Sequence, residues 1–75
     1  MLDLGLPGRL RAARAAARLN QRSVARVFGV TLNTIANWEN GRSVPSITRI
    51  GRLATLYRVS TDWLLTGVAA MPHRM

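Results

Sequence analysis

Apolar side chains recur along this chain at the three- and four-residue spacing of amphipathic helices. The clearest example is the stretch 47–57, in which Ile50, Leu53, Ala54 and Tyr57 share one face. Together with four similar stretches it predicts five helices, at residues 9–19, 21–28, 32–40, 47–57 and 61–66. The sequence has no alternation of polar and apolar residues of strand length and no internal repeat. We therefore expect an all-α fold.

The ends of the predicted helices are marked by residues with known capping preferences. Residues of the N-cap type precede four of the helices: Asn20, Thr31, Ser46 and Ser60. Glycines stand where three helices should end: Gly29, Gly41 and Gly67. The first helix is expected to begin only after Pro7 and Gly8. These signals divide the chain into an N-terminal extension (1–8), one helical domain (9–67) and a C-terminal tail (68–75).

Size and composition limit the kinds of site that the chain can hold. Its 75 residues support one small core. The sequence has no cysteine and a single histidine, His73, so it offers neither a disulfide nor a cysteine-ligated zinc. It also lacks the paired carboxylates, nucleophile with a base, or glycine-rich phosphate loop of an enzyme. We expect no metal, no cofactor, no small-molecule ligand and no catalytic activity.

Charge narrows the choice of partner. The chain carries 11 arginines and 3 acidic residues, a net charge of +8, which attracts polyanions such as nucleic acid. An anionic membrane is the rival partner, but no segment approaches the ~20 apolar residues that span a bilayer. The N-terminus also lacks the basic and apolar regions of a secretory signal. We therefore expect a cytoplasmic protein that binds nucleic acid.

The connection between the second and third predicted helices has the length found in a helix-turn-helix. Only Gly29, Val30 and Thr31 separate the stretches 21–28 and 32–40. In this motif the second helix lies in the major groove of DNA, and the first crosses above it with its N-terminus toward the phosphates. Short helix pairs are common in all-α domains, so the spacing alone is weak support for DNA binding.

Several segments together resemble the phage repressor and Cro-type helix-turn-helix family. They are Leu19-Asn20-Gln21, Val24-Ala25, Phe28-Gly29-Val30-Thr31, Thr34-Ile35, Trp38-Glu39-Asn40-Gly41-Arg42, Pro45-Ser46 and Asp62-Trp63-Leu64-Leu65. The resemblance extends from about Arg9 to Gly67. It implies a compact five-helix domain that binds double-stranded DNA, acts as a homodimer on pseudo-palindromic operators and regulates transcription as a repressor.

Placement in that family assigns the reading of base edges to residues at and after the start of the third helix: Thr31, Leu32, Asn33, Ala36 and Asn37. An asparagine amide pairs with adenine through two hydrogen bonds, whereas leucine and alanine offer only apolar contact to a thymine methyl group. The half-site is therefore expected to be rich in A·T pairs. Alternatively, the side chains of Asn33 and Asn37 are solvated surface amides that do not contact DNA. Leu32, at the start of a short helix, has no obvious core to join.

The same placement assigns contacts with the DNA backbone to Asn20, Gln21, Arg22, Thr34, Asn40, Arg42 and Ser43. Gln21 follows the Asn20 cap, where free backbone N–H groups and the helix dipole favour a phosphate. Its alternative is an ordinary exposed polar residue at a helix start. Arg22 and Ser23 depart from the acidic residues that the family more often has there, which weakens the local capping box and strengthens attraction to DNA.

Arg14 and Glu39 are interpreted as a structural ion pair, because an arginine at this position pairs with the glutamate of the Trp-Glu-Asn-Gly segment in the resembled family. Removing one partner of such a pair would leave the other charge buried. Arg9, Arg11 and Arg18 are left open between a solvated face and phosphate contacts. Core positions are expected for Ile35 and the four aromatic residues: Phe28, Trp38, Tyr57 and Trp63.

Two expectations concern protein partners. Apolar residues near the C-terminus exceed what so small a core can absorb and predict the surface at which two copies pair: Leu64, Leu65, Val68, Ala69 and Met71. The competing function is a protein-interaction module, for example an antitoxin-type partner, that keeps the same fold. The polar residues at groove-facing positions and the net charge of +8 favour DNA over such a partner.

Overall fold

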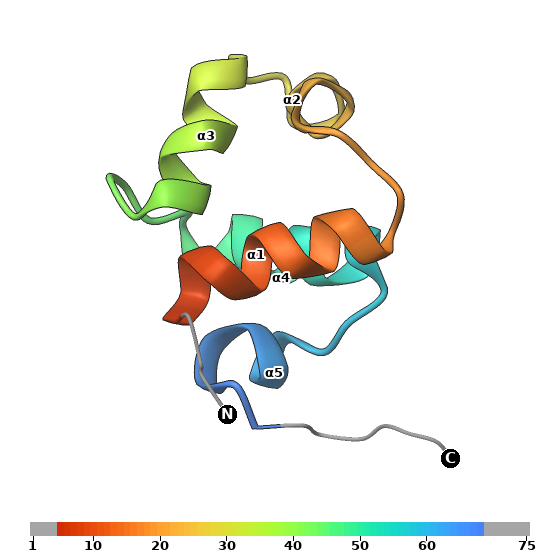
Figure 1. Ribbon diagram of the computed structural model, residues 1–75, viewed down its shortest axis with the longest axis vertical. Helices are drawn as coiled ribbons and strands as arrows, with labels where there is room; N and C mark the ends of the chain where they lie inside the picture. The colour runs from red at the N-terminus through yellow and green to blue at the C-terminus, as the bar shows by residue number, and fades with distance from the viewer. Residues whose placement is uncertain (1–4, 69–75) are drawn as a thin grey trace.

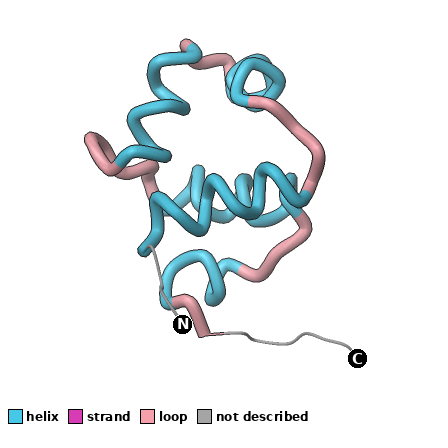
Figure 2. Tube along the Cα trace, in the orientation of Figure 1, coloured by secondary structure: helices cyan, strands magenta, loops and turns pink. Residues whose placement is uncertain are grey.

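The structure is a computed structural model that describes residues 5–68 of the chain. These residues form five helices and the loops that connect them. They are α1 (Gly5–Ala16), α2 (Gln21–Phe28), α3 (Leu32–Asn40), α4 (Ile47–Tyr57) and α5 (Thr61–Thr66). No strand occurs among these residues (Figure 2), so the predicted all-α fold is confirmed. The bounds of the last four helices agree with prediction, and those of the first do not.

The predicted start of the first helix is wrong. α1 begins at Gly5 rather than at Arg9, because Pro7 lies in its first turn, where a missing backbone N–H costs no helical hydrogen bond. Arg9 is consequently a buried helix residue whose Nε donates to the Leu64 carbonyl at 2.8 Å and whose Nη2 donates to the Leu65 carbonyl at 3.1 Å. Arg9 therefore belongs to neither a solvated face nor a phosphate rim, and it joins α1 to α5.

The predicted end of the first helix is also wrong. α1 ends at Ala16, and Arg18 then takes the left-handed conformation with φ of 62°, which glycine adopts more readily. The Leu19 N–H donates to the Arg14 carbonyl at 3.2 Å, and Arg14 Nη1 donates to the Leu19 carbonyl at 2.9 Å. These two hydrogen bonds close the turn that leads into α2. The division of the whole chain into extension, domain and tail stays a prediction.

The capping residues act as their sequence positions predict. Each N-cap side chain accepts a hydrogen bond from the backbone N–H three residues later, at 2.8 to 3.2 Å: Asn20, Thr31, Ser46 and Ser60. Gly29, Gly41 and Gly67 end α2, α3 and α5 in the left-handed conformation. α4 ends instead on Arg58, with φ of 59°, which no residue type in the sequence indicated.

The helices enclose one apolar core. α1 runs through the middle of the molecule and packs on α3, α4 and α5, while α2 packs on α3. Figure 1 shows α2 and α3 at one end of the long axis and α5 toward the other. The largest fully buried side chains come from every helix: Leu10, Val24, Ile35, Ile50, Leu53 and Leu64. The fold thereby leaves the outer sides of α2 and α3 to solvent.

Most of the predicted core positions are confirmed. Ile35, Phe28, Trp38 and Tyr57 are buried. Trp63 is only half-buried, packed against the edge of the core. Val27, which has helical spacing with Val24 and Phe28, is 54% exposed, because the short α2 contacts its neighbours over a narrow stripe.

Two arginines of α4 stack on aromatic rings of the helix pair α2 and α3. Phe28 and Trp38 meet edge to face with ring centroids 6.0 Å apart and an interplanar angle of 83°. The guanidinium carbon of Arg52 lies 4.4 Å from the Phe28 ring centroid, and that of Arg49 lies 5.8 Å from the Trp38 ring centroid. Cation–π attraction of this kind contributes about 0.5–1 kcal/mol at exposed sites. These contacts brace α2 and α3 against α4.

Candidate nucleic-acid interface

The turn between α2 and α3 has the compact geometry that the spacing of its residues predicts. Gly29 caps α2 with φ of 66°, and the Val30 N–H donates to the Ala25 carbonyl at 3.0 Å. Thr31 then takes an extended conformation as the N-cap of α3. Figures 1 and 2 show this loop at the end of the molecule away from α5. The N-terminus of α3 is therefore presented to solvent.

The outward face of α3 carries the residues predicted to read bases. Ile35 and Trp38 point into the core with 1% and 4% exposure, which turns the opposite side of the helix outward. On that side Leu32 and Asn33 are exposed, and Ala36 and Asn37 are half-buried. The side-chain amides of Asn33 and Asn37 have no hydrogen-bond partner among residues 5–68. Their donors and acceptors are thus available to a ligand.

The side chain of Thr31 contacts both the backbone and the side chain of Thr34. The Thr31 Oγ1 accepts from the Thr34 N–H at 3.2 Å and lies 3.0 Å from the Thr34 Oγ1. This arrangement fixes the first turn of α3. The structure therefore shows a capping role for both residues, and their predicted contacts with DNA stay predictions.

The N-terminus of α2 lies next to the last turn of α3 and carries three of the residues predicted to bind phosphate. The Asn20 Oδ1 accepts from the Ser23 N–H at 2.8 Å and from the Ser23 Oγ at 3.0 Å, so Ser23 supplies part of the capping that an acidic residue would give. Gln21 Nε2 donates to the Glu39 Oε1 at 3.0 Å. Arg22 is exposed and has no side-chain partner in the described part of the chain.

The side chain of Glu39 in α3 accepts hydrogen bonds from α1 and from α2 and so links the three helices. Its carboxylate is 3% exposed and accepts from Arg14 Nε at 2.7 Å and from Arg14 Nη2 at 3.1 Å, in addition to Gln21. The hydrogen bond with Glu39 raises the pKa of Arg14 against the opposing effect of burial. Burial, followed by the negative charge of Glu39, raises the pKa of Tyr57 to about 12. The structure thus brings together Arg14 and Glu39, as expected, and adds Gln21 to the pair.

Arg11 is a further residue of this network, and the sequence had left its role open. Its Nη2 donates to the Glu39 backbone carbonyl at 2.9 Å. α3 has no basic residue in its last turn, so Arg11 supplies from α1 the positive charge that stabilises a helix C-terminus. The lack of a basic residue in the last turn of α3 is the sequence signal that an arginine from another element could stabilise this helix end, but it does not identify Arg11.

The loop that follows α3 uses its backbone donors internally and presents side-chain donors to solvent. The Asn37 carbonyl accepts from the Arg42 N–H at 2.9 Å and from the Ser43 N–H at 3.3 Å, and the Asn40 Oδ1 accepts from the Arg42 N–H at 3.3 Å. The side chains of Arg42 and Ser43 are exposed and have no partner among the described residues. The loop is therefore ordered by its backbone and leaves the Arg42 guanidinium free.

The exposed charges on this surface are positive. Within residues 5–68 the acidic side chains are Glu39, which is buried in its ion pair, and Asp62 of α5. Arg22, in the first turn of α2, and Arg42, in the loop after α3, are both exposed, and no exposed acidic side chain of α2 or α3 neutralises them. A surface of this kind attracts a polyanion and suits phosphate contacts, which supply affinity while base contacts supply specificity.

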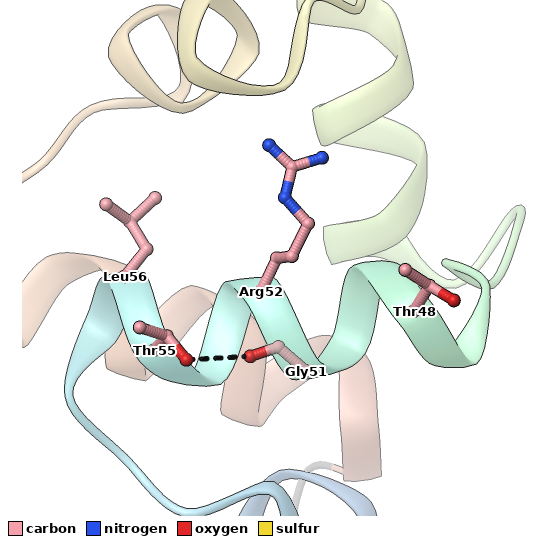
Figure 3. Close-up of a pocket in the computed structure, with 5 residues that line it drawn as sticks. All are labelled: Thr48, Gly51, Arg52, Thr55 and Leu56. Carbon is pink, nitrogen blue, oxygen red and sulfur yellow. Dashed lines mark hydrogen bonds between the residues drawn. The ribbon is translucent and has the colours of Figure 1, made fainter.

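Two hollows lie elsewhere on the surface. One, of about 430 Å³, runs along α4 and is lined by Thr48, Gly51, Arg52, Thr55 and Leu56 (Figure 3). All five residues come from a single helix, whereas ligand sites bring polar groups together from several elements. The other, of about 400 Å³, lies between α1 and α3 beside the Arg11 hydrogen bond to Glu39. We assign no small-molecule ligand to either hollow.

The described helices include neither a membrane-spanning helix nor a cluster of metal ligands. None of them has the length and apolar character needed to cross a bilayer. Residues 5–68 also contain no group of three side chains of the metal-ligating types.

Comparisons with known proteins point to one family. A sequence model of the helix-turn-helix family matches residues 10–64. A protein of Haemophilus influenzae, described as an uncharacterised helix-turn-helix-type transcriptional regulator, is 44% identical over 43 residues, which are 57% of this chain and 18% of that protein. The chain thus spans about a fifth of that relative.

A solved structure has the same fold. The P22 c2 repressor, crystallised in complex with the synthetic operator 9T, superimposes with a TM-score of 0.79 at 26% sequence identity. The match covers 88% of this chain and 100% of the repressor chain.

Proposed function

Because the chain belongs to the phage repressor and Cro-type helix-turn-helix family, we propose that it regulates transcription by binding double-stranded DNA with α3 in the major groove. The observation that carries this proposal is the outward face of α3, where Asn33 and Asn37 hold unpartnered amides, together with the exposed side chains of Arg22 in α2 and Arg42 in the loop after α3. Amides read base edges, and cations bind the DNA backbone.

Phosphate contacts would hold the helix pair on the DNA backbone at two places. At the N-terminus of α2, free backbone N–H groups, Gln21 and Arg22 would bind one phosphate. At the C-terminal end of α3, Asn40, Arg42 and Ser43 would bind another. The hydrogen-bond network of Glu39 links these two places, so the separation between the phosphate contacts is set by the fold.

We propose that two copies bind one pseudo-palindromic operator, with half-sites one turn of B-DNA apart, at ~34–36 Å. Leu65 and Val68 are exposed on and after α5 and support a pairing surface there. Leu64, predicted as part of that surface, is fully buried in the core and cannot contribute to it. Ala69 and Met71 lie outside the described residues. Repulsion between like-charged copies makes the free dimer weak.

More specifically, we propose that the chain is a repressor that acts in the cytoplasm and has no catalytic activity. The resemblance of the fold to the P22 c2 repressor supports repression. The competing role is a protein-interaction module or antitoxin-type partner with the same fold. A domain that only bound other proteins would have no use for both the unpartnered amides of α3 and a net charge of +8.

Selection of bound sequences from a random DNA pool, followed by a footprint, tests the proposal. We expect a palindromic, A·T-rich site occupied by two copies of the chain. Weak binding without sequence preference, together with low sensitivity to salt, would instead support the protein-interaction role.

A further inference from the structure

Two residues other than glycine take the left-handed backbone conformation in the described part of the chain, and both are arginines. Arg18, after α1, has φ of 62°, and Arg58, after α4, has φ of 59°. In this conformation the Cβ atom comes close to the following carbonyl oxygen, so glycine adopts it at the least cost. The side chains of both arginines are exposed. Each arginine therefore occupies a position that backbone preference alone would give to glycine.

The charge of the helix ends explains Arg58 but not Arg18. The C-terminus of a helix carries a partial negative charge that a nearby cation stabilises. α4 has no basic residue in its last turn, so Arg58, directly after it, supplies this cation. α1 already has Arg14 in its last turn, and Arg14 Nη1 donates to the Leu19 carbonyl just beyond the helix at 2.9 Å. The end of α1 therefore does not depend on the charge of Arg18.

The turn that contains Arg18 is joined to the N-terminus of α2 by side-chain hydrogen bonds. The backbone of Leu19, the next residue, exchanges two hydrogen bonds with Arg14, at 3.2 and 2.9 Å. Arg14 also binds the Glu39 carboxylate, which accepts from Gln21 at 3.0 Å. The turn and the first residue of α2 are thus held by the same ion pair. The backbone of Arg18 consequently has a defined position relative to the start of α2.

Arg18 lies within reach of the DNA backbone if Gln21 binds a phosphate as proposed. Three residues separate their Cα atoms, which are therefore at most about 11 Å apart. Successive phosphates of one strand follow each other every ~3.4 Å along the duplex axis, so the long arginine side chain can reach a phosphate next to that of Gln21. The Arg18 side chain has no partner among residues 5–68. Its charge is therefore available to a ligand.

We propose that Arg18 binds the DNA backbone beside the phosphate held at the N-terminus of α2. The contact adds affinity for every sequence and preference for none, because a phosphate carries no base identity. The arginine in the left-handed position thus exchanges some backbone stability for attraction to DNA. This inference rests on the proposed function and adds a phosphate contact from outside the two helices of the helix-turn-helix.

The experiment measures binding of the parent and of Arg18→Gly to the selected operator over a range of salt concentrations. Glycine removes the charge and suits the left-handed backbone, so the variant should melt at a temperature no lower than the parent. The slope of log affinity against log salt should decrease by ~1 per copy of the chain. The affinity advantage of the parent should accordingly shrink about 3.5-fold per copy between about 50 mM and about 200 mM salt. Sequence preference should not change.

Arg58→Gly is the matched control, because it removes the same charge from the same kind of backbone position. Figure 1 shows that the connection after α4 runs toward α5, whereas the connection after α1 runs toward α2. Arg58→Gly should therefore leave the salt slope unchanged. Arg18→Lys keeps the charge and should retain the slope of the parent.

An unchanged slope in Arg18→Gly would overturn the inference. An equal decrease in both glycine variants would do the same, since net charge rather than a contact would then be responsible. So would a decrease in Arg18→Lys as large as that in Arg18→Gly. If the parent selected no DNA sequence, the proposed function and this inference would both be wrong, whereas selective binding with an unchanged slope in Arg18→Gly refutes only the inference.

Discussion

Gln21 Nε2 donates a hydrogen bond to the Glu39 Oε1 at 3.0 Å, which joins the first residue of α2 to the last turn of α3. The same oxygen accepts from Arg14 Nη2 at 3.1 Å. Gln21 is thus oriented by a buried ion pair, and one amide N–H remains for the phosphate contact proposed for it. The two helices of the helix-turn-helix are held together by a polar contact at the end of α3 as well as by the core.

Removing the Glu39 carboxylate should destabilise the fold strongly. In Glu39→Ala the Arg14 side chain, which is 16% exposed, loses its ion-pair partner, and breaking such a pair costs ~3–5 kcal/mol. Chemical denaturation measures the loss in the free energy of unfolding. Glu39→Gln is the control, because it keeps the shape and an acceptor oxygen and should lose less. Equal stability of Glu39→Ala and the parent would contradict the role of Glu39 in linking α1, α2 and α3.

Stability should fall at high pH because of Tyr57. Its pKa is raised from 10.0 to about 12 by burial and then by the charge of Glu39. The folded state therefore favours the protonated phenol, and this contribution is fully present below pH 10 and is lost as the pH rises through about 12. Thermal unfolding followed from neutral pH upward should show this decline.

Tyr57→Phe is the control for that decline, because it keeps the ring in the core and removes the titrating group. The variant should lose less stability over this pH range than the parent. An identical decline in both proteins would show that Tyr57 does not cause it.

Asn37→Ala should separate DNA reading from folding. The amide is unpartnered in the described residues, so the free energy of unfolding should change by no more than ~0.5 kcal/mol. If Asn37 pairs with an adenine, binding to the selected site should weaken by ~1–3 kcal/mol and that base position alone should become tolerant. Asn33→Ala should behave likewise at a neighbouring pair. A well-folded double variant that selects the parent's operator would rule out α3 as the reading element.

Arg42→Ala should weaken binding to all sequences about equally. A phosphate contact carries no sequence information, so the dependence of log affinity on log salt should decrease in slope by ~1. Arg26→Ala is the matched control, since Arg26 is exposed on α2 but is not assigned to the DNA backbone. A change in sequence preference in Arg42→Ala would identify Arg42 as a base-reading residue instead.

The sequence by itself determined the bounds of four helices and most of the core. Each N-cap hydrogen bond joins residues three apart, as in the pair Thr31 and Thr34, so it follows from local residue types. Burial of Ile50 and Leu53 likewise follows from periodicity within one helix. These interactions are decided by neighbours in the chain, and a pattern of a few residues is enough to predict them.

Only the tertiary structure decided which partners Arg9 and Arg11 of α1 have. Arg9 donates to a carbonyl 55 residues away and Arg11 to one 28 residues away. Both acceptors are backbone carbonyls, which every residue possesses, so no side-chain type in the sequence marks them. The hydrogen bond of Gln21 was also not predicted, because its acceptor is a carboxylate 18 residues away. Its partner Glu39 comes within reach because the packing of α1, α2 and α3 brings the end of one helix to the start of another.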